Sequence, residues 1–215
     1  MLRVFCDFDG TITERDTIVF LTERFGAGPE FRRAVLERIT RGEISVFEAV
    51  RLELETVRVD WNTAVETLRR EVRVDPYFEP FVRWAREQGI TPEIVSSGMR
   101  PIVELYVGHL GLPIYAHEVT PSPGGWRYAK VEAADKQRIL EQACGRGFVV
   151  YVGDGASDVS VADLVDLLLA KRGRYLERWC RERNRSFISY ADFRDVQAAV
   201  AAILEKERIS LPSSN

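Results

Sequence analysis

Short apolar runs that end in polar residues alternate with helical sequence along most of this 215-residue chain. The clearest run, residues 148–152, leads straight into Gly153, and residues 2–8 run into a turn at Gly10. Runs this short and this uniformly apolar are typical of strands buried on both faces. Because helical segments separate them, the pattern predicts an α/β fold in which helices cover both faces of a mostly parallel sheet.

Further strand candidates follow beyond residue 76. They comprise residues 93–96, 114–120, 126–131, 167–170 and 187–189. Gly124 and Gly125 give a turn signal between the second and third of these runs, so we expect that pair to form a hairpin. Ligands of such folds bind beyond the carboxyl ends of the strands, so polar residues at those ends are the candidates for chemistry.

Residues 14–75 follow a different pattern and are called the helical insert below. Apolar residues recur there at helical spacing, no convincing strand interrupts them, and Ser45 with Glu48 forms a capping-box pattern. We therefore expect a small helical domain inserted after the first strand. The predicted organisation is a core domain of residues 1–13 and 76–208, the helical insert, and a disordered tail of residues 209–215.

Composition excludes several classes of protein. The formal net charge is -3, with both signs interspersed, which is unlike the basic stripe of a nucleic-acid-binding protein. No apolar stretch approaches the roughly 20 residues that span a bilayer. Cys6, Cys144 and Cys180 are too few and too scattered for a disulfide framework or a zinc site. We expect a cytoplasmic protein with reduced thiols that binds neither membrane nor nucleic acid.

Two acidic motifs follow predicted strands directly. Asp7 and Asp9 lie in DFDGT, and Asp154 and Asp158 lie in GDGASD. Like charges held together in a buried site are costly, and a divalent cation would remove that cost. Each motif alone is equally typical of a polar turn in which an aspartate caps a helix. Because both stand at one edge of the same predicted sheet, a hard-metal site is favoured.

A serine and a lysine complete a potential anion site. Ser96, followed by Ser97 and Gly98, ends another predicted strand, where a hydroxyl and free backbone amides can bind an anion. Lys136 stands at a helix start and could neutralise a phosphate, with Lys130 as its competitor. Taken singly, the serines indicate only a turn, and either lysine indicates a solvated surface charge.

Together these motifs resemble, in order, spacing and strand context, those of the haloacid dehalogenase superfamily of aspartyl-phosphate phosphatases. The resemblance rests on DFDGT at 7–11, Ser96 in VSSG, Lys136, and GDGASD at 153–158. It covers the whole chain, because the helical insert looks like the cap that these enzymes place between their first two motifs. It implies a Rossmann-like core with a small helical cap domain.

The resemblance also implies roles in catalysis. Asp7 would be the nucleophile, and Asp9 would protonate the leaving alcohol and then activate water. A carboxylate attacks phosphorus only when the negative charge of the phosphate is neutralised, and Lys136 would pair with both the phosphate and Asp7. The phosphate-binding residues implied in this way are Thr11, Ser96, Ser97, Gly98 and Lys136.

The implied cofactor is Mg²⁺. Its ligands would be Asp7, the backbone carbonyl of Asp9, and Asp154, while Asp158 would orient either a water on the metal or Lys136. A set of oxygen ligands alone fits Mg²⁺ far better than zinc.

Within the superfamily, the short helical insert looks like that of phosphoserine phosphatases. The C-terminal part is more similar to the methionine-salvage phosphatase that acts on 2-hydroxy-3-keto-5-methylthiopentenyl-1-phosphate, as is the segment 96–99. The residues that carry this second likeness are 166–170, 175–176, 180–182 and 190–193. This chain lacks the cysteine-rich insert that the family places before its lysine.

Substrate specificity is assigned to residues near the insert. Asp16 could take the place of the acidic residue that follows DxDGT in phosphoserine phosphatases. Leu54 falls where those enzymes use an arginine for the substrate carboxylate, with Arg51 one turn away, and an apolar Leu54 disfavours phosphoserine. Leu54 is equally typical of plain core packing, and Lys171, which could reach substrate, of a surface charge.

The leading hypothesis is a Mg²⁺-dependent phosphatase for a small phosphorylated metabolite, similar to the methionine-salvage enzyme, with phosphoserine phosphatase as the alternative. A phosphosugar mutase or phosphotransferase on the same fold remains open. A phosphorylated receiver domain fits less well, because receivers carry their acceptor aspartate on a middle strand and not in a DxDGT motif at the first. An inactive scaffold fits less well because it has no need of both Asp7 and Asp9. The chain is expected to be a monomer or a homodimer.

Overall fold

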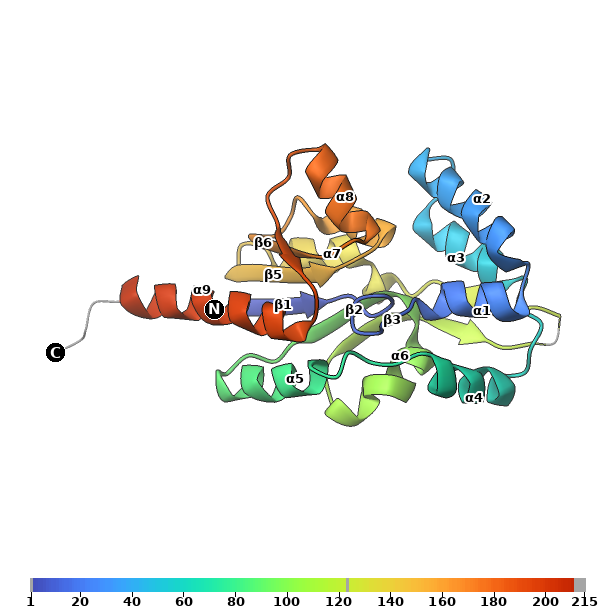
Figure 1. Ribbon diagram of the computed structural model, residues 1–215, viewed down its shortest axis with the longest axis horizontal. Helices are drawn as coiled ribbons and strands as arrows, with labels where there is room; N and C mark the ends of the chain where they lie inside the picture. The colour runs from blue at the N-terminus through green and yellow to red at the C-terminus, as the bar shows by residue number, and fades with distance from the viewer. Residues whose placement is uncertain (1, 123, 211–215) are drawn as a thin grey trace.

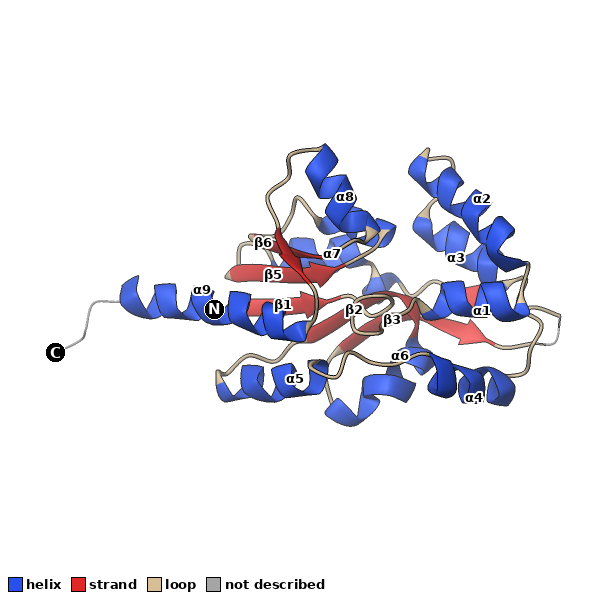
Figure 2. Ribbon diagram, in the orientation of Figure 1, coloured by secondary structure: helices blue, strands red, loops and turns tan. Residues whose placement is uncertain are grey.

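The computed structural model describes residues 2–122 and 124–210. Within these residues, seven strands form one sheet in the order β4-β3-β2-β1-β5-β6-β7, with helices on both faces (Figure 1, Figure 2). Only the β3–β4 pair is antiparallel, and the other neighbours run parallel. The predicted fold class and the predicted hairpin are therefore confirmed.

The strands and helices have the following bounds. The strands are β1 (Leu2–Cys6), β2 (Glu93–Met99), β3 (Ile114–Thr120), β4 (Arg127–Ala129), β5 (Phe148–Gly153), β6 (Leu167–Lys171) and β7 (Ile188–Tyr190). The α-helices are α1 (Thr17–Phe25), α2 (Gly28–Thr40), α3 (Val46–Leu54), α4 (Trp61–Glu71), α5 (Phe78–Glu87), α6 (Arg100–Val107), α7 (Lys136–Ala143), α8 (Tyr175–Glu182) and α9 (Phe193–Ser210). Short 3₁₀ helices occupy η1 (Gly108–Leu110), η2 (Glu132–Ala134) and η3 (Ala156–Val161).

The central strand β1 separates two apolar layers. Val4 and Cys6 face one layer, which includes residues of α5, α6 and α9. Phe5 faces the other layer, which includes residues of α7 and α8. Because successive side chains of a strand point to opposite faces, a strand buried on both sides must be apolar at every position. This explains the unbroken apolar runs in the sequence.

The helical insert leaves and rejoins the core through two adjacent segments. Thr13 and Val74 form an isolated antiparallel bridge. The Glu14 amide donates to the Arg73 carbonyl at 2.9 Å, and the Asp75 amide donates to the Ile12 carbonyl at 2.8 Å. The four helices α1–α4 lie between these segments (Figure 1). Ser45 caps α3 by accepting from the Glu48 amide, as the sequence predicted.

The hairpin of β3 and β4 holds the helical insert against the core. The Trp126 amide donates to the Leu54 carbonyl at 3.0 Å, and its indole Nε1 donates to the Val59 carbonyl at 2.9 Å. Phe47 at the start of α3 stacks on Tyr128 of β4, with ring centroids 4.9 Å apart. The position of the insert is thus fixed by a hairpin that follows it in the chain.

Two sequence expectations need correction or comment. Helix α9 continues to Ser210, so residues 209 and 210, which were assigned to a disordered tail, are helical. The rest of that predicted tail, residues 211–215, lies outside the described part of the chain. Among the described helices, none has the length and apolar content required to cross a membrane.

We predict that Trp126→Ala lowers the free energy of unfolding by about 3–5 kcal/mol, because it removes one of the largest fully buried side chains together with a hydrogen bond. Urea denaturation measures this change. Ile188→Ala is the control, since Ile188 is 40% exposed and its truncation should cost less than about 1 kcal/mol. Equal losses for the two variants would contradict the clamping role of the hairpin.

Candidate active site

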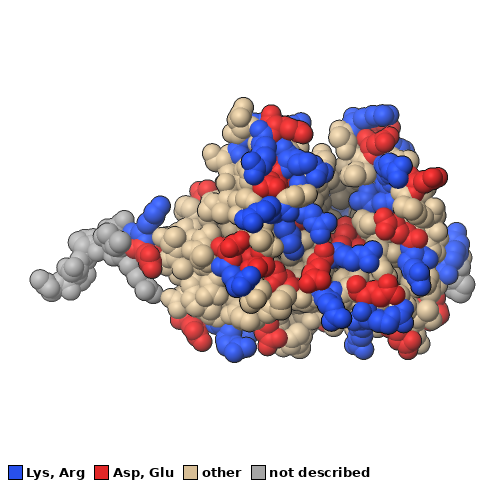
Figure 3. Space-filling model, viewed as in Figure 1, with Lys and Arg blue, Asp and Glu red and all other residues tan. Residues whose placement is uncertain are grey.

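A cavity of about 390 Å³ opens where the carboxyl ends of the central strands meet the helical insert. Figure 3 shows this face hollowed between the two parts of the molecule. Asp7, Asp9, Ser96 and Asp154 line its floor. These residues follow or end β1, β2 and β5, which are neighbours in the sheet, so the parallel topology gathers motifs that lie far apart in the sequence.

Lys136 is the centre of the charge network on this floor. It is buried in the first turn of α7, and its Nζ donates to Asp7 Oδ1 at 2.8 Å, Asp158 Oδ1 at 2.6 Å and Ser157 Oγ at 3.1 Å. Burial alone would lower the pKa of Lys136, but the charges of Asp158 and Asp7 outweigh that effect and raise it. The ammonium group therefore stays protonated beside Asp7.

Asp7 lies just beyond β1, and its amide donates to the Val152 carbonyl at 2.9 Å. Burial raises the pKa of Asp7 to about 7, against the lowering effect of Lys136. A positive charge brought near Asp7 would favour its ionised, nucleophilic form. Asp7 is thus oriented by the sheet and by Lys136, and it needs a further cation to be fully ionised at neutral pH.

Asp9 has one engaged oxygen and one free oxygen. Its Oδ1 accepts from the Thr17 amide at 2.8 Å and from Thr17 Oγ1 at 2.5 Å, whereas Oδ2 is buried without a hydrogen-bond partner among the described residues. Burial, and next the charge of Asp16, raise the pKa of Asp9 well above its ordinary value. A carboxyl group with a raised pKa and a free oxygen is suited to act as a general acid.

The last part of β2, Ser96 to Gly98, lies against Asp9, in a stretch where the register with β3 is irregular. The Gly98 amide donates to Ser96 Oγ at 2.9 Å, and the Ser97 carbonyl accepts from the Tyr128 hydroxyl. These three residues line the cavity. A Cβ atom at position 98 would overlap Asp9 Oδ2, so glycine is required for this close approach.

Thr11 lies away from the cavity, which departs from the predicted phosphate-binding role. Its side chain is fully buried, it does not line the cavity, and its Oγ1 donates to Asp154 Oδ1 at 3.2 Å. Gly10 turns the chain with φ +78°, and a Cβ there would overlap Asp154 Oδ2. Thr11 and Gly10 therefore position Asp154, and the carboxylate of Asp154 is what reaches the cavity.

Carboxylate oxygens of Asp7, Asp154 and Asp158 lie within 4.8 Å of one another. Burial, followed by the charges of Asp7 and Asp158, raises the pKa of Asp154 well above its ordinary value. Such a set of oxygen donors fits a hard divalent cation, which would remove the repulsion. Asp158 is already engaged, because its oxygens accept from Lys136, Tyr151 and the amides of Asp154 and Gly155. Asp7 and Asp154 are the residues better placed to bind a metal.

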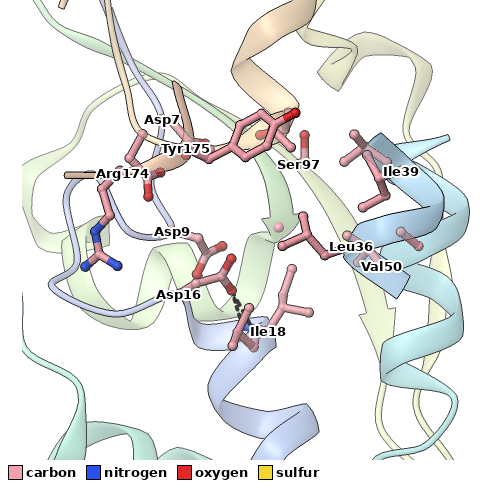
Figure 4. Close-up of a pocket in the computed structure, with 18 of the residues that line it drawn as sticks. Asp7, Asp9, Asp16, Ile18, Leu36, Ile39, Val50, Ser97, Arg174 and Tyr175 are labelled. Atoms are coloured by element: carbon pink, nitrogen blue, oxygen red, sulfur yellow. Dashed lines mark hydrogen bonds between the residues drawn. The ribbon is translucent and has the colours of Figure 1, made fainter. Parts of the chain in front are cut away.

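The opposite side of the cavity belongs to the helical insert. Figure 4 shows Ile18, Leu36, Ile39 and Val50 gathered there, facing the acidic floor. Arg32 and Glu53 also line this side and form an ion pair with Nε and Oε1 3.2 Å apart. Mostly apolar walls with few polar groups are typical of small-molecule sites.

The predicted specificity residues differ in position. Asp16 lines the cavity beside Asp9, and its Oδ1 caps α1 (Figure 4). Leu54 is fully buried in the core and does not line the cavity, because its side of α3 faces the hairpin. Arg51 points to solvent, where it pairs with Glu55 at 2.7 Å. The structure therefore does not support substrate contacts for Leu54 or Arg51.

Two further lysines are also placed away from the cavity. Lys130 pairs with Glu132 at 3.1 Å near the surface, so Lys136 is the lysine at the acidic floor. Lys171 does not line the cavity and donates to the Thr11 carbonyl at 2.9 Å. It therefore supports the loop that carries Asp7 and Asp9 rather than contacting a ligand.

Sequence reasoning missed the pair Arg32 and Glu53. A usable signal was present for Glu53, since it falls seven residues after Val46 and three after Val50, on the apolar face of α3. A charge at such a position needs a partner or a function. Arg32 carries no comparable signal, because α2 is rich in charge around it.

Comparisons with known proteins agree with this geometry. Residues 4–163 match the family model described as haloacid dehalogenase-like hydrolase. The chain is 34% identical to Pdp3-interacting factor 1 of Schizosaccharomyces pombe, over 91% of this chain and 93% of that protein. It is 30% identical to the polyol phosphate phosphatase PYP1 of Saccharomyces cerevisiae, over 95% of each chain.

A 2-hydroxy-3-keto-5-methylthiopentenyl-1-phosphate phosphatase of Brevibacillus brevis is also 30% identical, over 91% of this chain and 93% of that protein. Among solved structures, a phospho-aspartyl intermediate analogue of phosphoserine phosphatase superposes with a TM-score of 0.71. That match covers 92% of this chain and 97% of the other at 21% identity, and it concerns the fold alone.

We predict that Gly98→Ala lowers the rate of p-nitrophenyl phosphate hydrolysis by about 100-fold, because the new methyl group displaces the Asp9 carboxyl. Steady-state kinetics measures the rate, and circular dichroism checks the fold. Gly108→Ala is the matched control, since Gly108 has helical backbone angles and its added Cβ meets nothing closer than 3.5 Å. Equal activity of the two variants would show that the contact with Asp9 is unimportant.

We also predict that Asp154→Asn stabilises the metal-free protein, and does so more at pH 7.5 than at pH 5. The folded-state pKa of Asp154 is raised above its ordinary value of 3.8, so the folded state loses stability as pH rises above 3.8. Asn removes that charge but keeps an acceptor for Thr11. The gain should therefore be larger at pH 7.5 than at pH 5, because the folded state holds more of the unfavourable charge at the higher pH.

Urea denaturation in the presence of a chelator measures this gain at both pH values. Asp60→Asn is the control, because Asp60 is an exposed helix cap where Asn serves as well. A loss of stability in Asp154→Asn at pH 7.5 would overturn the assignment of Asp154 as a repelled carboxylate.

Proposed function

The chain belongs to the haloacid dehalogenase-like hydrolase family and is a phosphoric monoester hydrolase, and we propose that it transfers phosphate from a small ester first to Asp7 and then to water. One observation carries this proposal. Asp7 is held by Lys136 at 2.8 Å, while Asp9, two residues later, has a buried and unpartnered Oδ2 in the same cavity. A nucleophile and an acid are thus placed side by side.

In the first step, a carboxylate oxygen of Asp7 attacks phosphorus, and the bond between phosphorus and the ester oxygen breaks. The leaving oxygen takes the proton of Asp9, and the leaving group departs as an alcohol. Lys136 neutralises charge on the phosphate, and the end of β2 at Ser96, Ser97 and Gly98 offers a hydroxyl and backbone amides to its oxygens. The products are an alcohol and an aspartyl phosphate.

In the second step, the ionised Asp9 takes a proton from water as the water oxygen attacks phosphorus. The bond between phosphorus and Asp7 breaks, inorganic phosphate leaves, and both aspartates return to their starting states. This two-step route explains why Asp9 needs one oxygen fixed by Thr17 and the other free. The fixed oxygen keeps the group in position while its proton comes and goes.

We assign Mg²⁺ as the cofactor, held by the side chains of Asp7 and Asp154 and by the backbone carbonyl of Asp9. When bound, it would supply positive charge to the phosphate oxygens and keep Asp7 ionised. Asp158 would hold Lys136 and the loop after β5 in place, as its contacts with Lys136 and two backbone amides indicate.

The helical insert would serve as a cap domain of residues 14–75 over a core of residues 1–13 and 76–208. Support comes from the adjacent entry and exit segments around Thr13 and Val74 and from the share of the cavity wall that α1, α2 and α3 contribute. A cap would exclude water from the first step and choose the substrate.

The substrate would be a small phosphorylated metabolite. The methionine-salvage enol phosphate is the first candidate, supported by the Brevibacillus brevis relative and by the apolar cap wall, which suits an apolar tail. A polyol phosphate is the second candidate, supported by the Saccharomyces cerevisiae relative, whose match is longer. Phosphoserine is less suited, because Arg32, one of the two arginines with which the insert lines the cavity, is already paired with Glu53.

We predict that Asp7→Asn lowers Mg²⁺-dependent phosphate release from p-nitrophenyl phosphate by about 10³-fold or more, without loss of fold. A chelator should abolish wild-type activity, and Mg²⁺ but not Zn²⁺ should restore it. Asp163→Asn, at a side chain that is 76% exposed, is the control and should keep full activity. Near wild-type hydrolysis by Asp7→Asn would rule out the proposed nucleophile.

A further inference from the structure

The ion pair between Arg32 of α2 and Glu53 of α3 is unusual among the charges of the helical insert. Glu53 is only 3% exposed, yet it lines the cavity that also contains Asp7 and Asp9. By contrast, the ion pair between Arg51 of α3 and Glu55 at the C-cap of that helix is exposed, with side chains 39% and 46% exposed. Exposed pairs of that kind contribute little to stability and carry no desolvation cost.

The buried pair is incompletely satisfied. Arg32 Nε lies 3.2 Å from Glu53 Oε1, but Nε and Nη1 are both buried without a hydrogen-bond acceptor among the described residues. Burial raises the pKa of Glu53 to about 8 despite the neighbouring guanidinium. Holding the buried Glu53 beside Arg32, whose side chain is only 20% exposed, costs more than an apolar pair of similar size. A role in stability therefore does not explain the pair, and its place in the cavity wall points to a ligand.

The surroundings of the pair are apolar. Ile18, Leu36, Ile39 and Val50 line the same wall (Figure 4). The charged residues of the insert that line the cavity are Arg15, Asp16, Arg32 and Glu53. Asp16 lies beside Asp9 at the floor, whereas a ligand tail that reaches the apolar residues meets Arg32 and Glu53.

The formal charges of Arg32 and Glu53 cancel once Glu53 is ionised, which requires a pH above its pKa of about 8. A substrate carboxylate would satisfy Arg32 but face Glu53, and a substrate ammonium would face Arg32. A hydroxyl group can donate to Glu53 and accept from Arg32 at once.

We propose that Arg32 and Glu53 recognise a hydroxyl group on the uncharged tail of the substrate, and thereby select phosphate esters of small neutral hydroxylated compounds over esters that carry a second ionic group. This inference rests on the proposed phosphatase function and deepens it. An ester without the hydroxyl group would leave the polar groups of Arg32 and Glu53 without hydrogen-bond partners. A site of this kind discriminates strongly against such an ester.

The test is steady-state hydrolysis of three kinds of ester in saturating Mg²⁺ at pH 9, where Glu53 is ionised. Glycerol phosphate and a four-carbon polyol phosphate carry neutral hydroxyls, phosphoserine carries two further charges, and p-nitrophenyl phosphate reports the chemistry without either. Wild type should favour the hydroxylated esters over phosphoserine by 10-fold or more in kcat/KM. A wild type that hydrolyses only p-nitrophenyl phosphate, or prefers phosphoserine, would overturn the proposal while leaving the phosphatase function intact.

The variant Glu53→Gln keeps the size of the side chain and removes its charge. We expect it to lower kcat/KM for the hydroxylated esters by about 10-fold, mainly through KM, and to narrow the preference over phosphoserine, because Arg32 is then free to pair with a carboxylate. Hydrolysis of p-nitrophenyl phosphate, which offers the pair no hydroxyl, should fall less than hydrolysis of the hydroxylated esters. Arg32→Met should lower activity toward the hydroxylated esters without any gain for phosphoserine.

Glu55→Gln is the matched control, since it alters an exposed pair on the same helix and should change none of these ratios. Equal loss of activity toward all esters in Glu53→Gln would assign the pair a structural role and overturn the proposal, as would unchanged ratios. Absence of p-nitrophenyl phosphate hydrolysis in the wild type would instead reject the proposed function itself.

Discussion

A single buried ammonium group holds the acidic floor together. Lys136 binds both Asp7 and Asp158, and without it the floor would bring three carboxylates within 4.8 Å in a medium that penalises charge. Burial, and next the repulsion that one cation does not balance, raise the pKa values of Asp7 and Asp154. The protein alone therefore lacks positive charge at this floor, and a bound divalent cation would supply it for the reaction.

The floor could be predicted from the sequence because each of its residues stands at the end of a strand or the start of a helix. Once the strands are known to run parallel, Asp7, Ser96 and Asp154 must meet at one edge of the sheet, and no side-chain detail is needed. The uniformly apolar runs identified the strands, since only a sheet covered on both faces buries every position. The fold and the residues of the floor could therefore be predicted from the same pattern, and the family resemblance implied the catalytic roles of those residues.

The side of the cavity formed by the insert could not be predicted from the sequence in the same way. Periodicity showed that α2 and α3 are amphipathic, but how each helix rolls against its neighbours decides whether Leu54 or Glu53 reaches the cavity. The hairpin that fixes this roll follows the insert in the chain, with Trp126 bound to the Leu54 and Val59 carbonyls. The phosphate-binding role predicted for Thr11 departs from the structure for a related reason. The turn at Gly10 directs the Thr11 side chain inward to Asp154.

These two sides of the cavity imply a division of labour with a physical basis. The groups proposed to handle the phosphate lie at the carboxyl ends of the strands, where backbone hydrogen bonds hold them in place. The groups proposed to meet the rest of the substrate lie on helices joined to the core by two short segments, where substitutions disturb only local packing. A charged residue such as Glu53 on an otherwise apolar helix face breaks the local pattern. Such conflicts concentrate at functional sites, because selection for stability alone would replace the charged residue with an apolar one.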